Sequence, residues 1–150
     1  MTNNNNSTGK AIIAILVIWI AGFFLGWLVF GIALMKYYEA NMTHYEGLMK
    51  SMPDMVMLIL GSLTWSILTV YILHYLAGVR TFARGFIIVL IVNGLMTAGF
   101  DFYMYASMNL YSGSLLPVDI LVNALFGGVL GGIAGWILGM EKKDVTVNPR

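Results

Sequence analysis

Four long apolar runs, separated by short polar segments, dominate this chain of 150 residues. Each run is close to the roughly 20 residues that an α-helix needs to cross a bilayer. The runs cover about residues 10–35, 54–79, 86–106 and 115–140. We therefore expect an all-α polytopic membrane protein, a bundle of four antiparallel transmembrane helices within residues 10–140. The polar composition of residues 1–9 predicts a disordered tail, and that of residues 141–150 predicts a polar cytoplasmic tail.

The composition agrees with a membrane protein. Hydrophobic residues make up 59% of the chain and charged residues only 10%, whereas a soluble domain carries about 25% charged residues. The lipid bilayer is therefore the partner that the sequence implies most directly. A net charge of +1 argues against a nucleic-acid partner, for which a basic patch is expected. The chain contains no cysteine, which excludes disulfides and thiol chemistry.

The sequence offers no recognisable catalytic or cofactor-binding pattern. It lacks the G-x-S-x-G, H-E-x-x-H and phosphate-loop motifs. Neither His44 nor His74 has a second ligand at metal-binding spacing. We therefore expect no enzyme activity, no metal site and no cofactor.

The basic residues predict the orientation in the membrane. With the amino terminus inside, the outer side carries only Lys36 and Lys50. The inner side then carries Lys10, Arg80, Arg84, Lys142, Lys143 and Arg150. Cytoplasmic loops are enriched in Lys and Arg. The pattern therefore predicts that both termini are cytoplasmic.

The third span contains a stripe of polar side chains. They recur every four residues, at Asn93, Thr97, Asp101 and Tyr105. Residues at this spacing share one face of a helix. An ionisable group within a span is expensive and normally faces protein, water or a partner rather than lipid. Asp101 is therefore the first candidate for a functional residue.

The fourth span has a face that is polar at its outer end and glycine-rich below. This face carries Asp119, Asn123, Gly127, Gly131 and Gly135. Glycine weakens a helix, so a glycine face indicates close packing between helices; a groove lining a pore or substrate path is the alternative. In the first span, Gly22 and Gly26 form a G-x-x-x-G motif of the same kind.

The two aspartates are predicted to lie at similar depth. Counting along each helix places both about 6 Å inside the outer edge of the hydrocarbon core. The short loop between their helices makes these neighbours, so Asp101 and Asp119 could share a site with Asn93, Thr97, Asn123 and Tyr105. Two such carboxylates would share a proton or hold a cation or basic partner. Alternatively, Asp101 is neutral and bonds a Tyr or Asn, while Asp119 caps its helix.

Several short motifs carry a resemblance to known sequences. They are Met57-Leu-Ile-Leu-Gly-x-Leu, Arg80-Thr-Phe, Asp101-Phe-x-x-Tyr, Asn109-Leu and Val118-Asp119 before a glycine-rich helix. In these motifs the chain resembles uncharacterised bacterial families of small membrane proteins with four spans, known only as domains of unknown function. The resemblance implies a multi-pass protein of the bacterial inner (plasma) membrane and brings no activity with it.

Two functional hypotheses follow from the sequence. The first is a non-enzymatic accessory or assembly protein, which packs through its glycine faces with a second copy or with another membrane protein. The second is a small proton- or cation-coupled transporter or channel whose site is built on Asp101 and Asp119.

Overall fold

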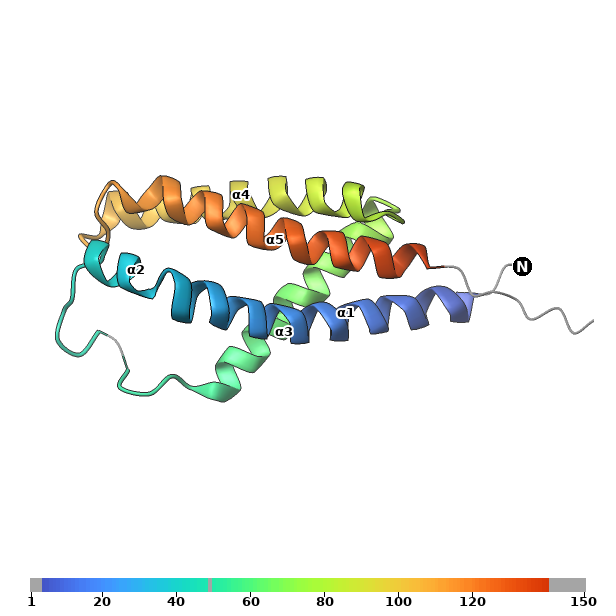
Figure 1. The fold of residues 1–150 in the computed structure, drawn as a ribbon, viewed down its shortest axis with the longest axis horizontal. Helices are drawn as coiled ribbons and strands as arrows, with labels where there is room; N and C mark the ends of the chain where they lie inside the picture. The colour runs from blue at the N-terminus through green and yellow to red at the C-terminus, as the bar shows by residue number, and fades with distance from the viewer. Residues whose placement is uncertain (1–3, 49, 141–150) are drawn as a thin grey trace, which may run out of the picture.

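The structure is a computed structural model that describes residues 4–48 and 50–140. Within these residues the chain is helical and contains no β-strand (Figure 1). In chain order the elements are α1 (Asn4–Gly26), the π-helix η1 (Trp27–Ala33), α2 (Met35–Asn41), α3 (Met55–Tyr71), the π-helix η2 (Ile72–Leu76), α4 (Phe82–Ser107) and α5 (Leu115–Gly139).

Four of the helical segments are long and apolar enough to cross a membrane. They are Ser7–Ala33, Met55–Leu76, Phe82–Ser107 and Leu115–Gly139. The predicted all-helical class and the four membrane-length helices are therefore confirmed. The third helix begins four residues earlier than the predicted residue 86, because the Thr81 hydroxyl caps it by accepting a hydrogen bond from the Arg84 backbone N–H.

The first helix also begins earlier than predicted. Residues 1–9 were expected to form a disordered tail, but α1 begins at Asn4. The Ser7 hydroxyl lies 2.8 Å from Nε2 of the buried His74, and Arg80 donates to the other ring nitrogen of His74. These bonds hold the start of α1 against η2. Residues 141–150, the predicted cytoplasmic tail, lie outside the described residues.

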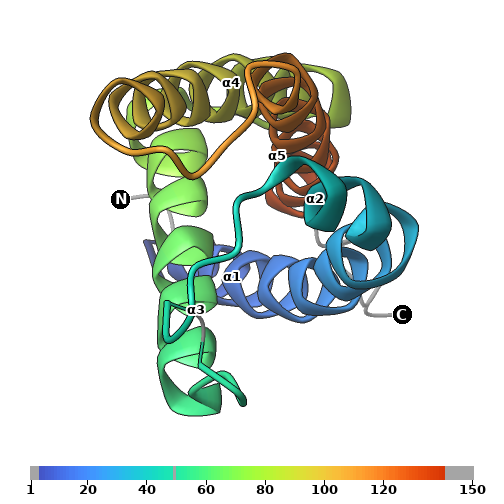
Figure 2. The same cartoon turned by 90° about the vertical axis from the view of Figure 1, so that its left-hand side faces the viewer.

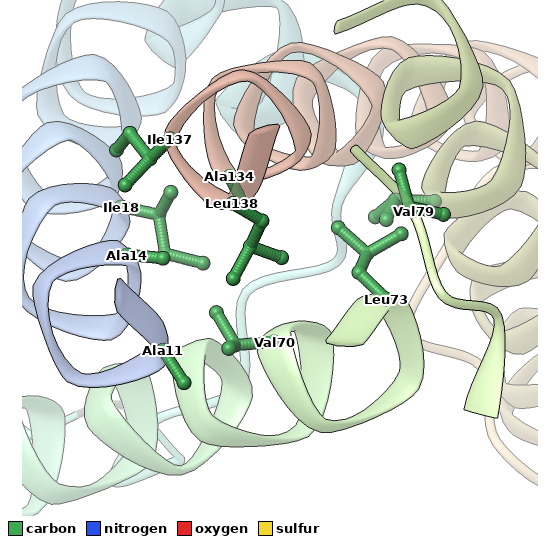
Figure 3. Packing of buried hydrophobic residues seen from close by; sticks show 10 residues of the cluster. Ala11, Ala14, Ile18, Val70, Leu73, Val79, Ala134, Ile137 and Leu138 are labelled. Atoms are coloured by element: carbon green, nitrogen blue, oxygen red, sulfur yellow. The ribbon is translucent and has the colours of Figure 1, made fainter. Parts of the chain in front are cut away.

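One hydrophobic core joins all four long helices at the end where α1 begins. Its buried residues are Ala11, Ala14, Ile18, Val70, Leu73, Val79, Val89, Ala134, Ile137 and Leu138. Figure 3 shows the side chains of Ile18, Leu73 and Leu138 pointing toward a common centre. From this end α4 and α5 continue side by side, while α3 crosses the bundle at a steep angle (Figure 1). At the other end α3 therefore diverges from the other three long helices.

The contact between α4 and α5 is a contact between backbones. A Cβ atom added to Gly131 would lie 2.6 Å from the Gly85 carbonyl oxygen, and one added to Gly135 would lie 2.5 Å from the Thr81 carbonyl oxygen. At Gly127 it would lie 2.2 Å from the Asn93 amide nitrogen. No larger residue fits at these positions without a shift, so the glycines set how closely the two helices approach.

The glycines of the first span also face neighbours in the same chain. A Cβ added to Gly22 would lie 3.2 Å from Leu130, and one added to Gly26 would lie 3.7 Å from Phe126. Both neighbours are side chains of α5. The glycines of α1 therefore contact side chains of α5, whereas α4 contacts the backbone of α5.

We predict that Gly131→Ala destabilises the protein by about 1–3 kcal/mol, the usual effect of overpacking. The matched control is Gly61→Ala, also within a helix, because a Cβ at Gly61 meets nothing within 4 Å. This control should be neutral or slightly stabilising, since alanine favours helix over glycine. Thermal unfolding in detergent measures both variants. Equal melting temperatures for the two would contradict close contact between α4 and α5.

Candidate functional site

A cavity of about 830 Å³ lies between α1, α3, α4 and α5, where α3 turns away from the bundle. Figure 2 shows these four helices from the end that carries α2. Its size falls in the range of about 300–1,000 Å³ that is typical of small-molecule pockets. The polar side chains along its wall include Trp19, Ser62, Ser66, Thr69, Asn93, Thr97, Asp101, Tyr103, Tyr111, Asp119 and Asn123.

Asp101 is the most deeply buried acid of this cavity. Its side chain is only 5% exposed, and its Oδ2 atom has no hydrogen-bond partner among the described residues. Buried polar atoms in proteins nearly always have such a partner. The sequence alternative was that a neutral Asp101 bonds a Tyr or Asn, and among the described residues no side chain of either type donates a hydrogen bond to its Oδ2 atom.

Asp119 lies beside Asp101, near enough for the two carboxyl groups to interact. It is held by the hydroxyl of Tyr38, which donates to Asp119 Oδ1. The Asp119 carboxylate does not cap α5: the residue before that helix is Ser114, and no side chain caps it. Asn123 donates instead to the backbone oxygen of Asp119, at 2.9 Å. The capping alternative for Asp119 is therefore wrong.

A second cavity, of about 210 Å³, also adjoins the acid pair. Asp101, Tyr111 and Asp119 line both cavities. The other residues around the small cavity are Tyr38, Met42, Leu115 and Leu116. The two carboxyl groups thus stand in a wall between a large space inside the bundle and a small one below α2.

The segment that covers the small cavity is fastened to the loop between α4 and α5. Asn41, the last residue of α2, accepts hydrogen bonds from the hydroxyls of Ser112 and Ser114, each at 2.9 Å. Backbone bonds join Thr43 to Leu110 and Ser112 to Asn41, again at 2.9 Å. We refer to these contacts as the Asn41 clamp. It brings Tyr38 to the acid pair.

The walls of both cavities lack a positive charge. Among the described residues, no Lys, Arg or His lines either of them. Two neighbouring carboxyl groups in a poorly solvated place are not both ionised unless a cation compensates them. The arrangement therefore calls for an exchangeable proton or a bound cation.

The structure brings together five of the six predicted site residues. Asp101, Asp119, Asn93, Thr97 and Asn123 line the larger cavity, and the Asn93 amide lies 3.5 Å from the Asn123 backbone oxygen. Tyr105 does not join them, because its side chain is half exposed and its hydroxyl lies toward Gly113. One turn beyond Asp101, the face of α4 has rotated out of the cavity.

Sequence reasoning missed the two tyrosines at the acid pair. Tyr38 bonds Asp119 from 81 positions away, and Tyr111 lies in a loop, so neither belongs to a periodic pattern. Trp19 was also missed as a site residue: its indole N–H donates to the Ser62 hydroxyl at 2.9 Å. The serine face of α3 was the one visible signal, since Ser62, Ser66 and Thr69 follow helical spacing.

No protein-family model, curated protein or solved structure matches this chain. The resemblance to uncharacterised bacterial membrane proteins therefore stays a prediction.

Burial and the adjacent acids keep both tyrosines protonated. For Tyr38, burial raises the pKa most, followed by the hydrogen bond to Asp119 and the negative charges of Asp119 and Asp101. For Tyr111, burial comes first and the charges of Asp101 and Asp119 follow, again raising the pKa. A phenol whose pKa is raised remains a hydrogen-bond donor through the physiological range.

We predict that Tyr38→Phe leaves the phenolate absorbance unchanged at a pH of about 10, which is the ordinary pKa of a tyrosine side chain. Tyr38 contributes no phenolate at that pH because its pKa is raised. In an Asp119→Asn background the same substitution should remove some phenolate absorbance, since part of the shift is lost. Ultraviolet difference titration measures both pairs. Loss of half a phenolate or more from the otherwise unchanged protein would contradict the contact between Tyr38 and the acids.

Proposed function

We propose that this chain is a small proton- or cation-coupled transporter of the bacterial inner membrane, with four antiparallel spans and cytoplasmic termini. The observation that carries the proposal is Asp101, which is only 5% exposed, lies beside Asp119 and has one carboxyl oxygen, Oδ2, without a hydrogen-bond partner among the described residues. No Lys, Arg or His of the described residues lines the cavity around this pair. Such a pair is suited to bind and release a proton or a cation.

A purely structural role explains the pair poorly. A buried carboxyl group stabilises a fold when its oxygens are hydrogen-bonded, and an unsatisfied one costs free energy. The Oδ2 atom of Asp101 has no bond that would offset this cost among the described residues. Neighbouring buried acids in a cavity wall are typical of functional sites in membrane proteins.

The position of the pair between two cavities supports transport rather than static binding. A solute held by Asp101 and Asp119 has the large cavity on one side and the small cavity on the other. Tyr38 of α2 and Met42 line the small cavity, and the Asn41 clamp holds this segment in place through hydrogen bonds between polar side chains and loop backbone. Opening of such a segment would expose the pair to the outer side without disturbing the core.

We place the assembly hypothesis second. It depended on glycine faces that are available to a partner, but Gly127, Gly131 and Gly135 face α4 of the same chain, and Gly22 and Gly26 face α5. Substitutions at these glycines are therefore expected to affect folding before they affect association.

We predict that Asp101→Asn weakens cation affinity or proton uptake by about tenfold or more, since a hydrogen bond to a charged group contributes about 1.5–3 kcal/mol. Infrared titration of the carboxyl stretch in nanodiscs, with sodium and potassium added in turn, measures binding. A pH-sensitive dye inside liposomes measures proton flux. The control is Glu39→Gln, an exposed acid on α2 that lines neither cavity.

The control should behave like the unchanged protein in both assays. A carboxyl band that ignores pH and both cations, together with equal flux for Asp101→Asn, would refute the transport proposal and leave the acid pair as a structural element.

A further inference from the structure

The larger cavity is much too large for a lone inorganic ion. It measures about 830 Å³, whereas one water molecule occupies about 30 Å³ in the liquid. A small cation bound at Asp101 and Asp119 would occupy only a small part of this cavity. The dimensions instead suit an organic molecule.

The cavity wall is polar at one end and aromatic and aliphatic along its length. Asp101 and Asp119 form the acidic end. The apolar wall includes Trp65 of α3, Phe100 of α4 and Phe126 of α5. A ligand that satisfies both parts has a positive charge and a bulky apolar body. Aromatic faces also attract organic cations through their quadrupoles.

The mouth of the cavity lies between α3 and α4. The two helices have little contact with each other, since α3 packs against α1 while α4 packs against α5. Leu95, Phe100 and Tyr103 of α4 line the cavity and are 70%, 62% and 79% exposed, and Trp65 across the gap is 49% exposed. These large exposed side chains belong to both helices, which places the opening there.

With these helices across a bilayer, this mouth would face the hydrocarbon layer. Leu95 lies 13 residues into the span Phe82–Ser107, which corresponds to about 20 Å along the helix. Trp65 is likewise near the middle of Met55–Leu76. A molecule that enters at this depth comes from the lipid rather than from water, so it must partition into the bilayer. Anions are disfavoured by the two acids.

We propose that the ligand of the large cavity is an amphipathic organic cation, which enters laterally from the bilayer between α3 and α4 and exchanges with a proton at Asp101 and Asp119. This inference rests on the proposed function and specifies its substrate class. The exchange balances in charge: the bound cation takes the place of the proton, and that proton is released to water.

The test uses the full chain in nanodiscs with tetraphenylphosphonium as the probe. Tetraphenylborate, an anion of the same shape, is the control ligand. We expect saturable binding of the cation, detected by tryptophan fluorescence and calorimetry, with release of a proton to a weakly buffered medium. We expect no saturable binding of the anion, because the cavity has acids and no base in its described wall.

Variants separate the charge from the apolar wall. Asp101→Asn should abolish proton release and weaken binding of the cation by about tenfold or more. Trp65→Ala should weaken binding by about fivefold, the effect of one aromatic–cation contact, while the infrared response of the carboxyl groups to pH stays as in the unchanged protein. The matched control, Trp136→Ala, removes a tryptophan that is 58% exposed and does not line the cavity. Phe100→Ala at the mouth serves as a second variant if Trp65→Ala does not fold.

Each outcome separates this inference from the transport proposal. If sodium or potassium shifts the carboxyl band but tetraphenylphosphonium does not bind, the inference fails and the transport proposal stands. If neither ion type has an effect, the inference fails, and the transport proposal fails with it when the carboxyl band also ignores pH and Asp101→Asn leaves proton flux unchanged. If the cation and the anion bind alike, or if Asp101→Asn binds the cation normally, the cavity is a nonspecific space for lipid and the inference is overturned.

Discussion

The close approach of α4 and α5 through glycine backbone is the constraint on which the rest of the molecule depends. In lipid, two apolar helices gain little from burying side chains against each other, so their association relies on close van der Waals contact. Gly85 and Gly131 provide that contact. Because the two helices are fixed along their length, the last turns of α4 lie opposite the first turns of α5, and Asp101 meets Asp119.

The same contact explains why a cavity exists. Since α4 packs on α5, and α1 packs on α5 and α3, α3 is the long helix of the described residues that remains to cover the polar face of α4. The core around Leu73 joins the C-terminal end of α3 to the bundle, and α3 diverges from the bundle toward its N-terminal end (Figure 1). The part of this face that α5 does not cover, with Asn93, Thr97 and Asp101 along it, therefore lines the cavity. The polar residues of α4 and the divergence of α3 together form one site: the first line the cavity, and the second leaves the space for it.

Much of this was accessible from the sequence. Apolar run length predicted the spans, four-residue spacing predicted the polar stripe, and a short loop predicted that the two acids are neighbours. The steep crossing of α3 was not predictable, because it results from packing at Val70 and Leu73 rather than from any local pattern. Tyr38 and Tyr111 reach the acids through long-range loop contacts, and Tyr105 is lost from the stripe because 3.6 residues per turn drift from a spacing of four. The early start of α1 could not be predicted from helix propensity, because the start of this helix is held by the hydrogen bond between Ser7 and the distant His74.

The two π-helical segments set the angular register of the ends of the bundle. Their wider turns are closed by bonds between residues five apart, such as Leu34 to Val29 and Ala77 to Ile72, each at 2.9 Å. Tyr38 follows the first segment and His74 lies in the second. Deleting one residue from 27–33 would rotate everything after it by about 100° relative to α1. Tyr38 would then face away from Asp119 although no residue of the acid site had changed, so these wide turns belong to the site as much as its side chains do.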